Sequence, residues 1–254
     1  MKNRVALGVV IAFAGFSTAS AAQPDQPWRI DAGASRSNLS GPQSAWNDAN
    51  IAFTYRPDLE TWWTARLEHS DRFGLTDNVA AARVAHVSPA RISGHFEVAV
   101  ADEADFRARA RLEAGALGPR LPLLADWSVA AGLDASVATY RAGEVTSLQP
   151  HLVLGRAQGT TVTVRLIETW DEYSRHRRGY AVRTVSPLSD RVSLTLSYAD
   201  APESDLGVTV KTEAVSASIA LDISDQLAVR TGVVHEARPA FDRTELSFGI
   251  TKRF

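Results

Sequence analysis

The last nine residues of the chain, LSFGITKRF (Leu246–Phe254), decide the fold that we expect. Apolar side chains alternate with small or polar ones in this stretch, at Leu246, Phe248, Ile250 and Phe254. Successive side chains of a β-strand point to opposite faces, so one face of this strand suits lipid and the other suits water. Lys252 interrupts the apolar face near its end, where a long side chain reaches the headgroup level. The pattern predicts the closing strand of an outer-membrane β-barrel.

A terminal strand that ends on Phe is also associated, in bacterial outer-membrane barrels as a class, with insertion into the membrane. Bacterial barrel-insertion machinery favours such strands, so this machinery is an expected partner of the chain. The expected recognition element consists of Leu246, Phe248, Ile250 and Phe254.

The amino terminus predicts export from the cytoplasm. Lys2 and Arg4 form a short basic region, residues 5–16 an apolar core and residues 19–22 a small-residue cleavage signal. The apolar run is shorter than the roughly 20 residues that a transmembrane helix needs. We therefore expect a cleaved signal peptide over residues 1–22 and one outer-membrane barrel domain over residues 23–254.

Composition narrows the classes of function. Removing Lys2 and Arg4 from the 27 basic residues leaves 25 against 29 acidic ones, a net charge of about −4, which does not suggest a nucleic-acid partner. The chain contains no Cys, which excludes disulfides and thiolate metal sites. Its 45% hydrophobic content is that of a soluble protein, but barrels hide their lipid-facing residues in alternation.

Alternating segments separated by turn signals fill the chain after Pro27. We count about fourteen, with twelve as the nearest alternative. Short turns such as residues 186–190 and 222–225 follow the even-numbered segments, and longer polar connections such as residues 170–178 follow the odd-numbered ones. This succession is the layout of an antiparallel up-and-down transmembrane barrel, so the predicted fold is all-β.

A secreted all-β binding protein would show the same alternation, with the apolar face turned toward its own core. The terminal strand and the regular succession of short and long connections favour the barrel. Alternation alone does not report which face meets water. The decisive observation is whether Val164, Leu194 and Phe248 point outward or pack together inside.

In its layout the chain resembles the YaiO family of outer-membrane β-barrel proteins. The resemblance rests on Trp28 soon after the cleavage site, the Tyr55-Arg56-Pro57 turn, repeated Ser-Pro turns, the strand Val192–Tyr198 and the terminal Phe254. It covers the whole exported domain but contains no sharp motif. It implies an outer-membrane location and a part in handling envelope polysaccharide, and it supplies no catalytic residues.

If the apolar faces meet lipid, the opposite faces place many charged side chains in the lumen. The predicted lumen charges are Arg66, Glu68, Arg83, Glu97, Arg107, Arg109, Arg111, Glu113, Asp126, Arg165, Arg183, Arg230 and Glu245. One interpretation is a network of paired charges, because a buried charge without a partner costs several kcal/mol. The other is a basic ladder of Arg107, Arg109 and Arg111, spaced about 6.6 Å apart along one strand, that attracts anionic solutes or polysaccharide. The two interpretations are compatible.

The connection at residues 170–178 mixes aromatic and basic side chains, namely Trp170, Tyr173, Arg175, Arg177 and Arg178. Exposed positive charge favours contact with anionic lipopolysaccharide and outer-membrane lipid. The alternative is a sugar-binding lip on which pyranose rings stack.

Signals for an enzyme are weak. No nucleophile elbow, phosphate loop or metal-ligand spacing is present, so we predict no catalytic residue, metal or cofactor. We expect a non-enzymatic envelope protein, either a narrow channel or an accessory barrel linked to envelope polysaccharide. The competing class is a barrel enzyme, a lipid or glycan hydrolase or acyltransferase. It would pair a Ser near the rim with His95, His151 or His235.

Overall fold

The computed structural model describes residues 26–41, 44–72, 74–205 and 208–254, and the predicted signal peptide lies outside these ranges. Within them the chain forms fifteen strands. The strands are β1 (Trp28–Leu39), β2 (Trp46–Tyr55), β3 (Thr61–Arg72), β4 (Leu75–Val87), β5 (Ser93–Asp102), β6 (Ala110–Leu117), β7 (Leu121–Leu124), β8 (Trp127–Thr139), β9 (Glu144–Arg156), β10 (Thr161–Trp170), β11 (His176–Pro187), β12 (Val192–Asp205), β13 (Val208–Ser224), β14 (Leu227–Ala237) and β15 (Asp242–Arg253). Among the described residues, no helix is long and apolar enough to cross a membrane.

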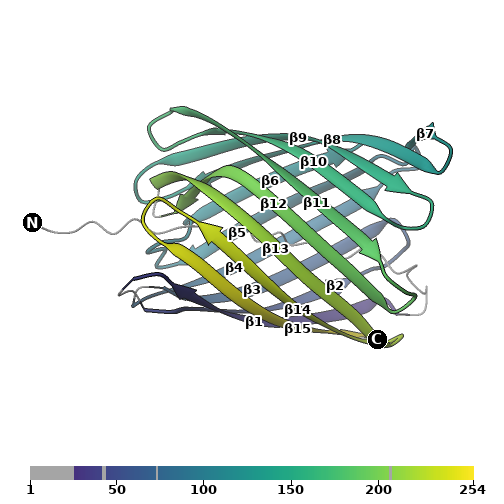
Figure 1. Cartoon of the computed structure of the whole chain (residues 1–254), viewed down its shortest axis with the longest axis horizontal. Coiled ribbons are helices and arrows are strands. Elements are labelled where there is room, and N and C mark those ends of the chain that lie inside the picture. The colour runs from purple at the N-terminus through teal and green to yellow at the C-terminus, as the bar shows by residue number, and fades with distance from the viewer. Residues whose placement is uncertain (1–25, 42–43, 73, 206–207) are drawn as a thin grey trace, which may run out of the picture.

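The strands form one closed antiparallel sheet (Figure 1). β15 pairs with β14 and also with β1, from Arg253 opposite Arg29 to Arg243 opposite Leu39, which closes the ring. β6 and β7 both pair with β8 and occupy one position of the ring, so the barrel has fourteen strand positions. This confirms the predicted all-β barrel and its strand number.

The break between β6 and β7 follows from local chemistry. Pro119 and Pro122 lack the N–H group that a sheet ladder requires, and the last backbone bond before the break runs from the Gly118 N–H to Ala131. The pairing of β7 with β8 is irregular between Pro122 and Leu124. The interruption lies at one end of the barrel, next to the turn that leads into β8.

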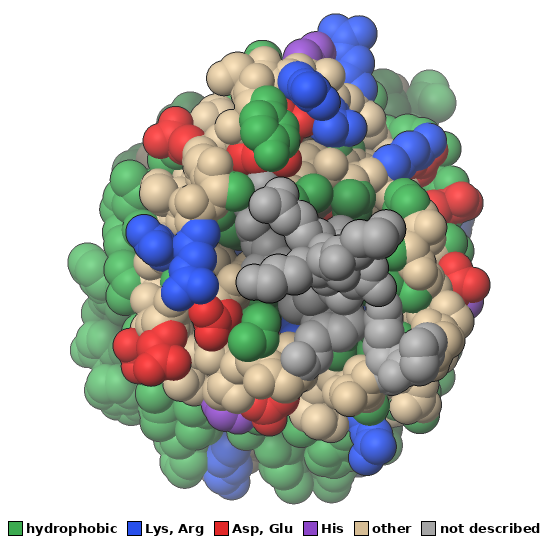
Figure 2. Space-filling view, turned by 90° about the vertical axis from the view of Figure 1, so that its left-hand side faces the viewer, with side chains coloured by type: hydrophobic (Ala, Val, Ile, Leu, Met, Phe, Trp, Pro, Cys, Tyr) green, Lys and Arg blue, Asp and Glu red, His purple; other side chains and the backbone are tan. Residues whose placement is uncertain are grey.

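The apolar face of the strands points outward. Phe248 is 59% exposed and Val164 40% exposed, and Leu194 shares the outward parity of Leu196 on β12. Figure 2 shows hydrophobic side chains on the flanks of the barrel and charged ones around its end. Ile167, Ala181, Ala199 and Ala201 form a small buried apolar cluster. The interior is therefore polar and the belt around it apolar.

The two ends of the barrel differ. We call the end where Trp28 pairs with Phe254 the terminal end, and the opposite one the loop end. Tight turns such as residues 157–160 and 188–191 lie at the terminal end. The loop end carries residues 103–109, 171–175 and 238–241, which fold back through hydrogen bonds of their own. Most connections are of similar length at the two ends, however: residues 140–143 and 171–175 separate neighbouring strands at the loop end, and residues 56–60 and 157–160 at the terminal end, so the predicted succession of short and long connections is wrong.

Candidate functional site in the lumen

Most of the predicted lumen charges lie on the inward face of their strands, because they alternate with exposed apolar residues. Arg66 on β3, for example, stands between Ala65 and the 58% exposed Leu67. The charges that share this inward placement are Arg66, Glu68, Arg83, Glu97, Arg111, Glu113, Arg165, Arg183, Arg230 and Glu245. The alternation therefore predicted correctly that these charges line the lumen. They differ in whether an opposite charge lies nearby.

Glu97 is the centre of a network on the β3–β6 side. Its carboxylate accepts hydrogen bonds from Arg111 at 2.6 Å and from Arg66 at 3.1 Å, and Arg83 lies 3.9 Å away. Glu97 is 3% exposed, so its charge is compensated almost entirely by these guanidinium groups. Arg66 also pairs with Glu68 at 2.7 Å. The paired-network interpretation holds for this part of the lumen.

The network continues around the wall to β10. Glu113 lies 3.3 Å from His95, and Asp134 on β8 pairs with Arg165 at 2.9 Å. His151 lies 3.6 Å from the same Asp134 carboxylate. Asp134 is absent from the predicted set, although its alternation with Leu133 and Ala135 placed it on the inward face.

The predicted ladder of three arginines on one strand is wrong in its geometry. β6 begins at Ala110, so Arg107 and Arg109 precede it. Arg107 lies 3.5 Å from Asp48 and 3.7 Å from Glu68, Arg111 binds Glu97, and Arg109 is exposed at the loop end. The three guanidinium groups therefore do not form a row of uncompensated charge.

The reason is a fold-back of residues 103–109. The Asp77 carboxylate accepts hydrogen bonds from the backbone N–H groups of Asp105, Phe106 and Arg107 at 2.7, 2.9 and 2.6 Å. Those groups are thus satisfied without a neighbouring strand. Phe106 is fully buried.

Asp126 also lies outside the lumen, where it was predicted. It lies in the turn before β8 and pairs with Arg156 at 2.6 Å at the terminal end, where both side chains are exposed. The hydrogen bond from Arg156 lowers the pKa of Asp126. Asp126 therefore belongs to the rim and not to the lumen wall.

The loop end contains a buried cluster whose members, apart from Glu245, the sequence did not reveal. The Trp46 ring lies between two guanidinium groups, at 4.7 Å from Arg72 and 5.3 Å from Arg243, and packs edge-on against Phe241. Arg243 bridges Glu236 at 2.7 Å and Glu245 at 3.0 Å. We call the following set the loop-end cluster: Trp46, Arg72, Glu203, Glu236, Arg238, Phe241, Arg243 and Glu245.

The wall opposite the network, from β12 to β1, is lined by small side chains. Its inward positions at mid-depth are mostly small, with Val234 and Arg230 of β14 as larger exceptions, and include Ser193, Thr195, Ser197, Ala214, Ser216, Ser218, Ala220, Gly232, Ser247, Gly249, Gly33 and Ser35. A Cβ atom on Gly232 would approach Ser218 and Ser247 to 3.0 Å, which shows how closely this wall is packed. Because these side chains are small, they fill little of the lumen on this side.

Arg183 on β11 and Arg230 on β14 border this small-residue wall. Neither forms an ion pair with an acidic residue in the described part of the chain. Arg230 reaches to 3.8 Å from the position that a Cβ on Gly249 would take. These two arginines differ from the compensated ones on the other wall.

The connection after β10 is a tight hairpin whose charges are largely compensated. Asp171 accepts hydrogen bonds from the backbone of Tyr173 and Arg175 and from the Arg177 side chain. Arg178 binds Glu168 at 3.0 Å. The Arg175 guanidinium lies over the 65% exposed Tyr173 ring.

Trp170 stacks on His176, with ring centroids 5.1 Å apart. One face of the indole is therefore occupied by the chain itself. Of the two aromatic rings predicted for a sugar-binding lip, Tyr173 is the more accessible.

The three histidines considered for an enzyme have partners other than Ser. His95 contacts Glu113, His151 contacts the Gln149 carbonyl and Asp134, and His235 contacts Thr244 on the outward face. Among the described residues, no hydrogen bond joins any of the three to a Ser side chain. The geometry that a barrel hydrolase would need is not present at these positions.

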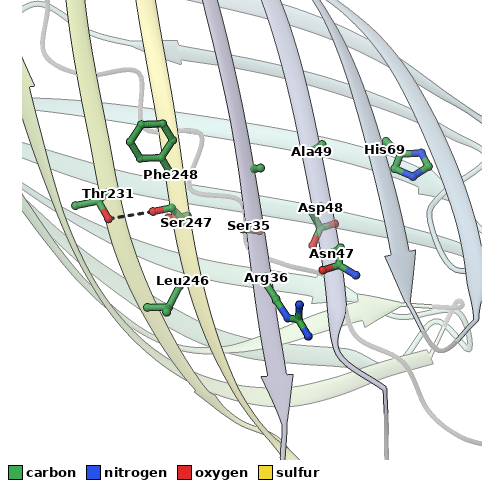
Figure 3. A pocket seen from close by; sticks show the side chains of 11 residues that line it. Ser35, Arg36, Asn47, Asp48, Ala49, His69, Thr231, Leu246, Ser247 and Phe248 are labelled. Atoms are coloured by element: carbon green, nitrogen blue, oxygen red, sulfur yellow. Dashed lines mark hydrogen bonds between the residues drawn. The ribbon is translucent and has the colours of Figure 1, made fainter.

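Two hollows of about 620 and 670 Å³ lie mainly on the outward face, the first over β1–β3, β14 and β15 and the second over β2–β5. Figure 3 shows the first, with Leu246 and Phe248 on one side of the strand that carries Ser35 and Arg36, and Ala49 and His69 on the other side. Outward alanines form these depressions in the apolar belt, so they belong to the lipid-facing surface.

Taken together, the closed antiparallel ring, apolar belt and charged lumen define a transmembrane β-barrel of the architecture found in outer-membrane channels. Among solved structures, the chain is similar to the CymD monoaromatic hydrocarbon channel, at 8% identity and a TM-score of 0.54, with 90% of this chain and 89% of that chain covered. It is also similar to OpdQ of Pseudomonas aeruginosa, at 9% identity and a TM-score of 0.54, covering 91% and 99%.

A third similar structure is the outer membrane protein Omp33 of Acinetobacter baumannii, at 13% identity and a TM-score of 0.52, with 90% and 98% covered. At these identities the likeness concerns the fold alone. No protein-family model matches the chain, and no curated protein matches it. Membership of the YaiO family therefore stays a prediction.

Proposed function

We propose that the protein is a narrow, non-enzymatic outer-membrane channel for small polar solutes. The observation that carries the proposal is the division of the lumen into two walls. Charged side chains fill the β3–β10 wall, whereas small side chains line the β12–β1 wall. Water reaches inward-facing groups, since the Arg111 and Arg165 side chains are 40% and 31% exposed and Arg230 is exposed. We therefore infer that solutes pass along the small-residue wall.

The loop-end cluster sets the size of the solute. Its side chains are almost completely buried, so the lumen narrows at this end. This favours small solutes over sugar chains, and a role as an accessory barrel for envelope polysaccharide would need a wider mouth. The fold of the similar structures, which include a channel by its printed name, is consistent with the proposal.

We further propose that the loop end, which carries the 103–109 fold-back and the loop-end cluster, faces the cell exterior, with Trp28 and Phe254 on the periplasmic side. Outward Arg36 and the hairpin residue Arg175 then meet the anionic headgroups of lipopolysaccharide. The terminal strand, with Phe248 and Phe254 exposed on its outward side, remains the proposed element for the barrel-insertion machinery.

Conductance across a planar lipid bilayer tests the channel. Purified protein should give stepwise currents, and Ser218→Trp on the inward face of β13 should reduce them because the indole fills the small-residue wall. Ala217→Trp, one residue away on the outward face, is the matched control and should leave the current unchanged. Absence of current in the folded wild-type protein, or equal currents in both variants, would contradict the proposal.

A further inference from the structure

Positive charge without a carboxylate partner gathers at one place in the lumen. Most inward arginines contact an acidic side chain: Arg66 and Arg111 contact Glu97, and Arg165 contacts Asp134. Arg183 and Arg230 have no such contact within the described ranges. Both side chains belong to the inward face, Arg183 on β11 and Arg230 on β14, and only β12 and β13 lie between these two strands.

Resting on the proposed channel function, we propose that Arg183 and Arg230 form a binding site for a small oxyanion, such as inorganic phosphate, within the lumen. The site lies on the small-residue wall, which is where the solute path runs. An anion bound there would compensate the charge of Arg183 and Arg230, as carboxylates compensate the arginines of the opposite wall.

The strands between the two arginines supply further hydrogen-bond donors. Arg183 stands opposite Ser197 on β12, and Ser197 stands opposite Ser216 on β13. Ser218 follows on the same inward face and pairs in register with Gly232 of β14. Hydroxyl groups therefore cover the wall between the two guanidinium groups, with no bulky or acidic side chain among them.

The chemistry of these groups selects oxyanions. A guanidinium donates two parallel hydrogen bonds to two oxygens of one anion, and hydroxyls donate to the remaining oxygens. A monatomic anion receives charge attraction but not this paired geometry. The two arginines should therefore attract chloride and hold phosphate more strongly.

Reversal potentials in a KCl gradient test the charge of the site. An Arg183→Gln/Arg230→Gln double variant should lower the chloride-to-potassium permeability ratio by about tenfold, since focused charge of one sign raises the local counter-ion concentration by that order. Phosphate added to the bath should reduce the chloride current of the wild type and leave that of the double variant unchanged. Arg191→Gln, which removes a charge from an exposed terminal-end turn, is the control.

Calorimetric titration of phosphate into detergent-solubilised protein tests the site without any current. Binding in the wild type and its loss in the double variant support the site, even if the bilayer shows no conductance and the channel function fails. An Arg183→Lys/Arg230→Lys variant should keep the chloride preference and bind phosphate more weakly. The site would be overturned if the double variant conducts with unchanged selectivity. It would also be overturned if the wild type and the double variant bind phosphate equally, or if neither binds it. A gel shift between heated and unheated samples verifies that each variant is folded.

Discussion

The carboxylate of Glu97 on β5 accepts a 2.6 Å hydrogen bond from the Arg111 guanidinium on β6. Glu97 also balances Arg66, so Glu97→Gln leaves at least two guanidinium groups short of a negative charge. We expect a loss of about 1–3 kcal/mol of stability, since the arginines still reach water. The measurement is the temperature at which the folded gel band converts to the unfolded one. Glu60→Gln in an exposed turn should leave that temperature unchanged.

Trp46 supports the loop end from within. Its side chain is fully buried and contacts Arg72, Arg243 and Phe241, so Trp46→Ala removes the largest group of the loop-end cluster. The expected cost is about 3–5 kcal/mol, as for a large aromatic deleted from a packed site. Denaturant titration followed by circular dichroism measures it. The same change at outward Trp63, which is 54% exposed, should cost clearly less, and equal costs would contradict this role.

Asp77 holds the 103–109 segment in the mouth of the barrel through three backbone hydrogen bonds. In Asp77→Asn an NH2 group replaces one of the two carboxylate oxygens, so at least one of the three hydrogen bonds is lost and the segment should be held less tightly. Trypsin cleavage at Arg107 should become faster, and the bilayer conductance should rise. Asp190→Asn in a terminal-end turn serves as the control. Unchanged cleavage at Arg107 would show that the segment is held by other contacts.

The hairpin after β10 should depend on pH through Asp171. Burial raises the pKa of this carboxyl, but the hydrogen bonds from Arg177 and from the backbone of Arg175 and Tyr173 outweigh it and lower the pKa overall. A lowered folded-state pKa gives stabilisation that is complete above the ordinary Asp value and is lost as the pH falls through the lowered one. Hydrogen exchange of the hairpin amides, corrected for intrinsic rates, should accelerate only in that acidic range. Asp171→Asn should accelerate it already at neutral pH.

Alternation in the sequence was sufficient to predict the fold. The outward positions of strands such as Val192–Tyr198 and Leu246–Phe254 follow from a period of two, and strand number follows from counting turns. The same rule failed at Phe106 and Ala108, where the alternation extends into a segment that is not a strand. The deciding group there is Asp77, which lies about 30 residues earlier, and local periodicity contains no information about it.

Pairing in the lumen was less predictable than orientation. The sequence placed Arg111 and Arg183 on the same inward surface, but their partners depend on how far each strand is shifted against its neighbours around the ring. Arg111 is opposite Ala99 in the register of β5 and β6 and reaches Glu97 diagonally, two residues along β5, whereas Arg183 is opposite Ser197. The sequence therefore identified the residues of the site without showing which of them remain available for a solute.

The unequal walls of the lumen also have a mechanical consequence. At mid-depth, salt bridges cross-link the strands from β3 to β10, whereas the strands from β12 to β1 are joined there mainly by their backbone ladder. Lateral pressure from the bilayer should therefore deform the barrel mainly between β12 and β1 and leave the half from β3 to β10 unchanged in shape. The half that yields is the one bordering the route proposed for the solute, so membrane tension would act directly on its width.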